Sequence, residues 1–214
     1  MLYIKLRLKA PYMSFSIPGS MQTQRFSGTS GHPTKSTIVG MICAALGIEK
    51  PHGKDDDPEL IRRYNEEYLP KIAMVDDDIT VYYIDDLSKN INIMSDFQQR
   101  RNGTYVIGDM KAQPVRETKY ERMRRVNGTL SEGEMAIRIK NYIENGDFTV
   151  YVGTKREEDL KAIYEALKRP YFSPFIGRKC CIPACQICEN EYRPLEMKDI
   201  EESIGGRKRV CLCD

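Results

Sequence analysis

The order of the strand and helix patterns in this sequence predicts an α+β fold, with helices covering one face of an antiparallel sheet. Apolar residues alternate with period two in residues 2–8, 78–84 and 148–152, as expected for strands with one buried face. Helical patterns occupy residues 34–46 and 157–168, after the first and third of these strands. The 214 residues are enough for one sizeable domain with its own core.

The N-terminal strand is the clearest element. Its apolar residues are Leu2, Ile4, Leu6 and Leu8. They alternate with Tyr3, Lys5, Arg7 and Lys9. The two later strands follow the same rule, because β-branched and aromatic residues recur at every second position. The polar residues 11–33 between the first strand and the first helix predict a long loop without core residues.

The first helix is expected to begin after Thr34, a residue type that caps helices, and to stop at Gly47. Residues 157–168 form an amphipathic helix, since their apolar residues fall on one side. Residues 58–68 are mostly charged and predict a surface helix. Residues 131–145 are also predicted to be helical, because Ser131 and Glu134 have the spacing of a capping box.

Charge is segregated along the chain, although the net charge is only +2. Residues 55–86 hold eleven acidic and three basic residues, whereas residues 98–125 hold eight Lys or Arg and three acidic residues. A polyanionic partner explains such an asymmetry, and an ordinary solvated face is the alternative. Glycine and proline interrupt the basic stretch, which predicts an excursion from the sheet.

These elements together predict a ferredoxin-like core with an insertion. The core comprises residues 1–87 and 129–183, and the basic excursion comprises residues 88–128. Residues 184–214 are expected to form a cysteine-rich, irregular C-terminal tail. The longest apolar run, Ile38–Ile48, is too short to cross a bilayer, and the N-terminus lacks the pattern of a signal peptide. We therefore expect a cytoplasmic protein without membrane contact.

Three segments resemble one known family. The first is Pro33-Thr34-Lys35-Ser36 with the following Ile38–Ile48, similar to a P-T-[KR]-S motif before a "GLLAAALGI"-like helix. The second, Tyr171–Pro183, is similar to "Y-x-P-Y-L-G-R-[RK]-S-C-P", and the third, Lys140–Val150, to "R-x-Y-L…D-A-x-F-x-V". These motifs resemble those of CasD, the fifth CRISPR-associated family, in its type I-E form.

The resemblance implies a ferredoxin-like, RRM-like domain of the RAMP superfamily with a protruding basic thumb. It also implies a function in antiviral defence, as a non-catalytic subunit of the Cascade ribonucleoprotein. Such subunits grip the 5′ handle of CRISPR RNA, contact the backbone and large subunits, and meet target DNA through the complex. The predicted basic excursion falls where the thumb belongs. Two departures lie early in the chain: residues 12–16 replace an "L-Q-S-W-G"-like element, and Arg25 replaces an arginine usually nearer the first motif.

The candidate RNA-binding residues are mostly basic. Thr34, Lys35 and Ser36 stand at a helix N-terminus, which favours a phosphate, although a plain helix cap is the alternative. Arg178 and Lys179 follow Gly177, where the backbone permits close approach. Arg25 is added from the resemblance. The thumb candidates, interspersed with Tyr105 and Tyr120 as stacking faces, are Arg100, Arg101, Arg116, Lys119, Arg122, Arg124 and Arg125.

Two alternatives remain, with no cofactor expected in the favoured interpretation. Related type I-C members cleave precursor CRISPR RNA without metal, and His32 is the residue best placed here as a base for that chemistry. The second alternative is a zinc-stabilised adaptor that docks another protein. Its zinc ligands are Cys185, Cys188, Cys211 and Cys213, although reduced cytosolic thiols explain the same cysteines.

Overall fold

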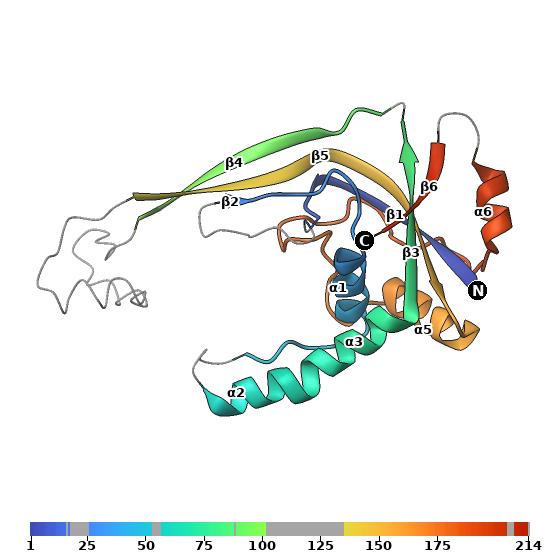
Figure 1. Ribbon diagram of the computed structural model, residues 1–214, viewed down its shortest axis with the longest axis horizontal. Helices are drawn as coiled ribbons and strands as arrows, with labels where there is room; N and C mark the ends of the chain where they lie inside the picture. The colour runs from blue at the N-terminus through green and yellow to red at the C-terminus, as the bar shows by residue number, and fades with distance from the viewer. Residues whose placement is uncertain are drawn as a thin grey trace, which may run out of the picture. The chain divides into compact units, whose positions relative to one another are not determined.

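The computed structural model describes residues 1–15, 17, 26–52, 57–87, 89–101, 135–204 and 208–213 (Figure 1). The chain forms two compact units, and each is described by itself. The larger unit comprises residues 1–20, 28–94 and 141–214. No helix among the described residues is long and apolar enough to cross a membrane.

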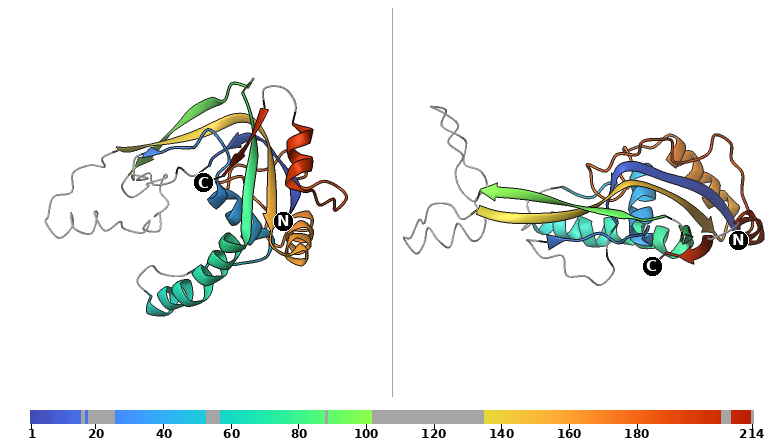
Figure 2. Two further views of the ribbon diagram at one scale, coloured as in Figure 1. Left: turned by 45° about the vertical axis from the view of Figure 1, so that its right-hand side comes forward. Right: turned by 90° about the horizontal axis from the view of Figure 1, so that it is seen from above.

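Four strands form the sheet of the larger unit, in the order β1-β5-β3-β6. Their bounds are Leu2–Met13, Met135–Thr154, Ile79–Asp86 and Lys208–Leu212, for β1, β5, β3 and β6. All three pairings along this path are antiparallel, and β1 and β5 run side by side (Figure 2). The structure thus confirms a mixed fold of helices and antiparallel sheet.

The predicted period-two alternation explains how this sheet separates two cores. Leu6 faces Val150 across the β1–β5 pair, and both are fully buried under α1 (Lys35–Ala45) and α5 (Glu157–Lys168). The intervening residues point to the opposite face, where Tyr3 and Tyr151 pack with Ile200 of α6 (Met197–Ser203). Burial of this apolar surface is the main favourable contribution to folding.

Several sequence predictions are confirmed in this unit. The helix at 157–168 has the predicted bounds and buries Leu160, Ile163, Tyr164 and Leu167. Gly47 ends the first helix with φ of 76°, a conformation that glycine adopts without strain. The charged surface helix begins at Pro58 as predicted but continues beyond residue 68, through α2 (Pro58–Arg63), the π-helical turn η1 (Tyr64–Tyr68) and α3 (Leu69–Asp78).

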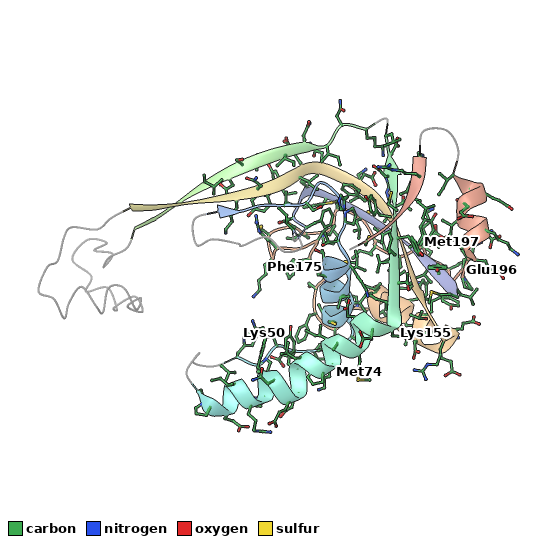
Figure 3. All side chains as sticks on the ribbon, in the orientation of Figure 1. Lys50, Met74, Lys155, Phe175, Glu196 and Met197 are labelled. Atoms are coloured by element: carbon green, nitrogen blue, oxygen red, sulfur yellow. The ribbon has the colours of Figure 1, made fainter. Side chains whose placement is uncertain are left out.

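The segment after residue 183 packs along the free edge of β1. The Arg7 amide donates to the Ile187 carbonyl at 2.8 Å, and the Ala184 amide donates to the Lys9 carbonyl at 2.7 Å. Further along, the tail forms α6, whose capping box joins Glu196 and Asp199; Glu196 is labelled at the start of this helix in Figure 3. These contacts satisfy backbone groups that an edge strand leaves exposed.

Two sequence predictions are wrong here. Residues 135–145 belong to β5 rather than to a helix, because Ile137 and Ile139 alternate with basic residues. Strand pairing, with β1 from Ile143 onward and with residues 26–27 before it, outweighs a local capping signal. The loop after the first strand does contribute to the core, since Met13 and Phe15 are fully buried. These two side chains pack into the core although the residues next to them in the sequence are mostly polar.

The smaller unit comprises residues 21–27 and 95–140. Its described part includes β2 (Phe26–Ser27), which pairs in parallel with β5 at residues 139–140. The strand β4 (Asn92–Arg101), which the sequence analysis did not predict, also pairs with β5. The domain boundaries proposed from the sequence stay predictions.

Candidate functional site

Gly177 fixes the loop that carries Arg178. Its φ is 93°, and a Cβ atom added to it would lie 1.6 Å from the Ser14 carbonyl oxygen. Next to it, the Ser14 amide donates a hydrogen bond of 3.2 Å to the Ile176 carbonyl. Only glycine combines this conformation with this close approach, so the loop is locked against the end of β1.

The Arg178 guanidinium is held by backbone and aromatic contacts. It donates to the Asn141 carbonyl at 3.0 Å, and its central carbon lies 4.6 Å from the centroid of the Tyr142 ring. A guanidinium over an aromatic face is stabilised by the ring's negative charge. The arrangement therefore fixes a cation at the surface, in a side chain that is only partly exposed.

Tyr142 supports this cation and is itself 5% exposed. The Cys180 thiol donates to its hydroxyl at 3.6 Å. Burial raises the pKa of Tyr142, and its hydrogen bond with Cys180 raises the pKa further, whereas Arg178 acts in the opposite direction. The phenol consequently stays neutral at neutral pH.

The N-terminus of α1 is the second candidate segment. Thr34 occupies the cap position with extended backbone, but its side chain makes no capping hydrogen bond. Its hydroxyl lies instead 3.1 Å from that of Thr37, and it is fully buried. Lys35 forms an ion pair of 3.3 Å with Asp76 of α3, while Ser36 is exposed. An anion at this helix end therefore competes with Asp76 for Lys35.

A short segment after β1 joins the two candidate regions. Ser14 contacts the Ile176–Gly177 loop, and the following residue, Phe15, accepts a hydrogen bond from the Ser30 amide at 3.0 Å. The Phe15 amide in turn donates to the Thr29 hydroxyl at 2.8 Å. Residues 29–30, which precede α1, and the loop carrying Arg178 thus contact the same two residues.

His32 lies just before α1. Its ring stacks on Tyr83, with centroids 5.1 Å apart and planes inclined by 4°, and its Nδ1 lies 3.3 Å from the Pro33 carbonyl oxygen. Burial raises the pKa of Tyr83 to about 12, with a further contribution from neighbouring Cys211. Tyr83 is therefore protonated at neutral pH, and it covers one face of the imidazole.

The remaining predicted RNA-binding residues fall into three groups. Lys179 is exposed, next to Arg178. Arg100 and Arg101 lie on β4, and the positions of their side chains are outside the described part. The other predicted residues lie outside the described residues altogether, and they are Arg25, Arg116, Lys119, Arg122, Arg124 and Arg125.

The four cysteines of the zinc hypothesis are not brought together. The backbone of Cys188 forms an isolated β-bridge with Leu6, on the outer edge of β1. Cys211, on β6, is paired with Tyr83 of β3 at the far side of the sheet. With β1, β5 and β3 between them, they are separated by roughly four strand spacings of ~4.8 Å. Within the described ranges no cluster of three or more His, Cys, Asp or Glu side chains is suited to a metal ion.

Sequence reasoning missed the residues that hold Arg178. Asn141 and Tyr142 were placed in a helix, which hid their relation to a loop 37 residues later. Only the glycine before Arg178 signalled a special backbone at this point. The aromatic side chain of Tyr142, a residue type that stacks on arginine, is the sequence signal for this contact.

Comparisons with known proteins agree with this architecture. A family model described as "CRISPR-associated protein (Cas_Cas5)" matches residues 3–212. Among curated protein sequences no match is found. The assignment of this chain to a family therefore rests on the match with the family model.

Two solved structures share the fold. One chain of a "CRISPR RNA-guided surveillance complex" superposes with a TM-score of 0.52 and 22% identity, over 86% of this chain and 61% of that chain. A second, described as "Crystal structure of Cas protein", gives a TM-score of 0.53 and 16% identity, over 94% of this chain and 69% of that one. This chain therefore spans less than two thirds of the surveillance-complex chain.

Proposed function

This chain belongs to the CRISPR-associated Cas5 family, and from that premise we propose that it is a non-catalytic, RNA-binding subunit of a type I-E Cascade complex. It binds the 5′ handle of CRISPR RNA and helps to assemble the complex for defence against foreign DNA. Its partners are the CRISPR RNA, the backbone and large subunits and, through the complex, target DNA. It acts in the cytoplasm, through a ferredoxin-like RAMP domain with a basic thumb in residues 88–128.

The fixed guanidinium of Arg178 is the observation that carries this proposal. A cation held by Asn141 and Tyr142 loses little conformational freedom when a phosphate binds, because its geometry is already set. Arginine offers a planar, multiply donating group that suits phosphate oxygens. Lys179 adds a second charge beside it, and residues 29–30, which precede α1, contact the same Ser14–Phe15 segment.

Cleavage of precursor CRISPR RNA is the second candidate function. The observation favouring it is the position of His32, which lies in the segment before α1, between Ser30 and Lys35. One face of the His32 ring is stacked on Tyr83, and a general base must still reach the ribose 2′-hydroxyl. We propose binding without cleavage as the function that these residues serve.

The proposal is tested by the affinity of the purified protein for a repeat-derived RNA over a range of salt concentrations. Arg178→Glu removes one phosphate contact, so affinity falls and the dependence of log Kd on log salt becomes less steep by ~0.7 for single-stranded RNA. Arg193→Glu is the matched control, since Arg193 is an exposed arginine of the tail. Equal affinity and equal slope for the wild type and Arg178→Glu would refute the assignment of Arg178.

A further inference from the structure

A groove lies beside the Arg178 loop, between α1 and the helical arm formed by α2, η1 and α3. It has a volume of about 880 Å³. Its floor includes Cys43 and Ala44 of α1, and its walls come from the arm and from residues 172–179. Lys50 and Phe175 lie on the same side of α1 in Figure 3. All of these residues belong to the larger unit.

Aromatic rings line both walls of the groove. Tyr64 and Tyr68 come from η1, and their ring centroids are 5.3 Å apart with planes inclined by 38°. Phe172 and Phe175 come from the facing loop, which is anchored to α1 by the hydrogen bond from the Phe172 amide to the Ala44 carbonyl at 3.2 Å. Aromatic side chains on two sides of a hollow provide contact surface for a planar aromatic ligand.

The charges at the groove favour an anion. Lys50 and Lys179 line it, and Lys50 Nζ lies 5.3 Å from the centroid of the Tyr64 ring. Among the described side chains neither lysine forms an ion pair with a carboxylate. Glu49 is the single acidic residue of the lining, against two lysines and His52.

No acidic residue of α2, η1 or α3 lines the groove. Arg62 binds Glu59 at 2.7 Å, Glu66 at 3.0 Å and Glu67 at 3.6 Å, all within the arm. The arm residues that line the groove are apolar or aromatic, and they are Leu60, Ile61, Tyr64, Tyr68 and Ile72. An acidic helix therefore presents an uncharged face to the groove.

We propose that this groove holds an unstacked nucleotide of the bound RNA, with its base between the tyrosines of η1 and the phenylalanines of the loop. Its phosphate is bound by Lys50 or Lys179. This inference rests on the proposed function. Lys179, which lines the groove, follows Arg178 directly, so an RNA strand bound by Arg178 is expected to pass the mouth of the groove. The volume lies within the usual range of small-molecule sites and accommodates one nucleotide. Stacking on aromatic rings combined with cationic contacts is the usual way of binding unpaired bases.

The test uses the full-length protein and a set of repeat-derived RNAs, each lacking the base at one position. Tyr64→Leu keeps apolar volume but removes the stacking face, so Kd for intact RNA rises by ~5-fold or more. One abasic RNA is expected to bind the wild type equally weakly, and Tyr64→Leu then causes no further loss. Met74→Ala is the control, since Met74 is a 73% exposed side chain of the same arm and lies outside the groove.

The outcomes separate this inference from the proposed function. If Arg178→Glu weakens binding while Tyr64→Leu leaves every RNA unaffected, the groove does not hold a base, and the RNA-binding function stands. If Tyr64→Leu leaves RNA affinity unchanged but weakens assembly with other subunits, the groove is a protein-docking site and the inference is overturned. A wild-type protein that binds no RNA, alone or with its partner subunits, overturns both.

Discussion

Replacing Gly177 by alanine tests how the backbone fixes the Arg178 loop. The substitution forces a residue with a Cβ atom into φ of 93°, and that atom would lie 1.6 Å from the Ser14 carbonyl oxygen. The loop must move away from the end of β1, because a Cβ atom and a carbonyl oxygen cannot approach each other so closely. The hydrogen bond from the Ser14 amide to the Ile176 carbonyl is then lost or lengthened.

The expected loss of stability follows from two contributions. A left-handed conformation costs a non-glycine residue ~1–2 kcal/mol, and a lost hydrogen bond costs ~1 kcal/mol. Together they lower the free energy of unfolding by ~2–3 kcal/mol. For a protein of this size each kcal/mol lowers Tm by ~2–4 °C, so a decrease of ~4–12 °C is expected.

The assay is thermal unfolding followed by circular dichroism, with RNA affinity measured on the same variant. Gly40→Ala is the control, because Gly40 lies within α1 and a Cβ added there meets nothing within 4 Å. In a helix alanine is favoured over glycine by up to ~1 kcal/mol, so this control is expected to raise Tm. If Gly177→Ala unfolds within ~1 °C of the wild type, the loop is not held as described and the reasoning fails.

Three further predictions concern the sheet, the core and the cysteines. The Arg7 side chain holds the pKa of Asp147 below its usual value, so this pair stabilises the fold above the unfolded-state pKa and ceases to do so as pH falls through the folded-state pKa. Because the pair is partly exposed, Asp147→Asn is expected to cost less than ~1 kcal/mol at pH 7 and nothing at strongly acidic pH, as denaturant titrations at both pH values will reveal. Leu160→Ala opens a cavity under the sheet and should lower the unfolding free energy by ~2–5 kcal/mol in urea, whereas a loss below ~1 kcal/mol would contradict its full burial. Removing metal with a chelator is expected to leave Tm unchanged, and a clear decrease, abolished by Cys185→Ser, would restore the zinc hypothesis.

Much of the core was predictable because its signals are local and repeated. The helix at 157–168 carries four apolar residues at helical spacing, and burial of all four follows directly from that pattern. The strands at residues 2–8 and 78–84 were equally clear, since alternation identifies both the element and its buried face.

The parts that sequence reasoning missed depend on contacts between distant residues. The capping-box spacing at Ser131 favoured a helix, but β5 pairs with β1 from Ile143 onward and also with β2 and β4, and these interactions decide the outcome. The short helix α6 has its own capping box at Glu196 and Asp199, although the cysteine-rich composition of the tail drew attention away from it.

The candidate site shows the same limit. Lys35, Ser36 and Arg178 were identified from motifs, but the sequence does not show that Lys35 is paired with Asp76. Nor does it show that Arg178 rests on Tyr142, which lies on a different element. A motif identifies which residues are candidates, and only the fold assigns their partners.

The most direct test of the central claim is to incubate the purified protein with labelled repeat RNA in EDTA and to analyse the products on native and denaturing gels. The account predicts a shifted, uncut band that forms with the 5′ handle in preference to scrambled RNA and weakens with Arg178→Glu. A discrete cleavage product that disappears with His32→Ala would contradict it and identify a processing ribonuclease instead.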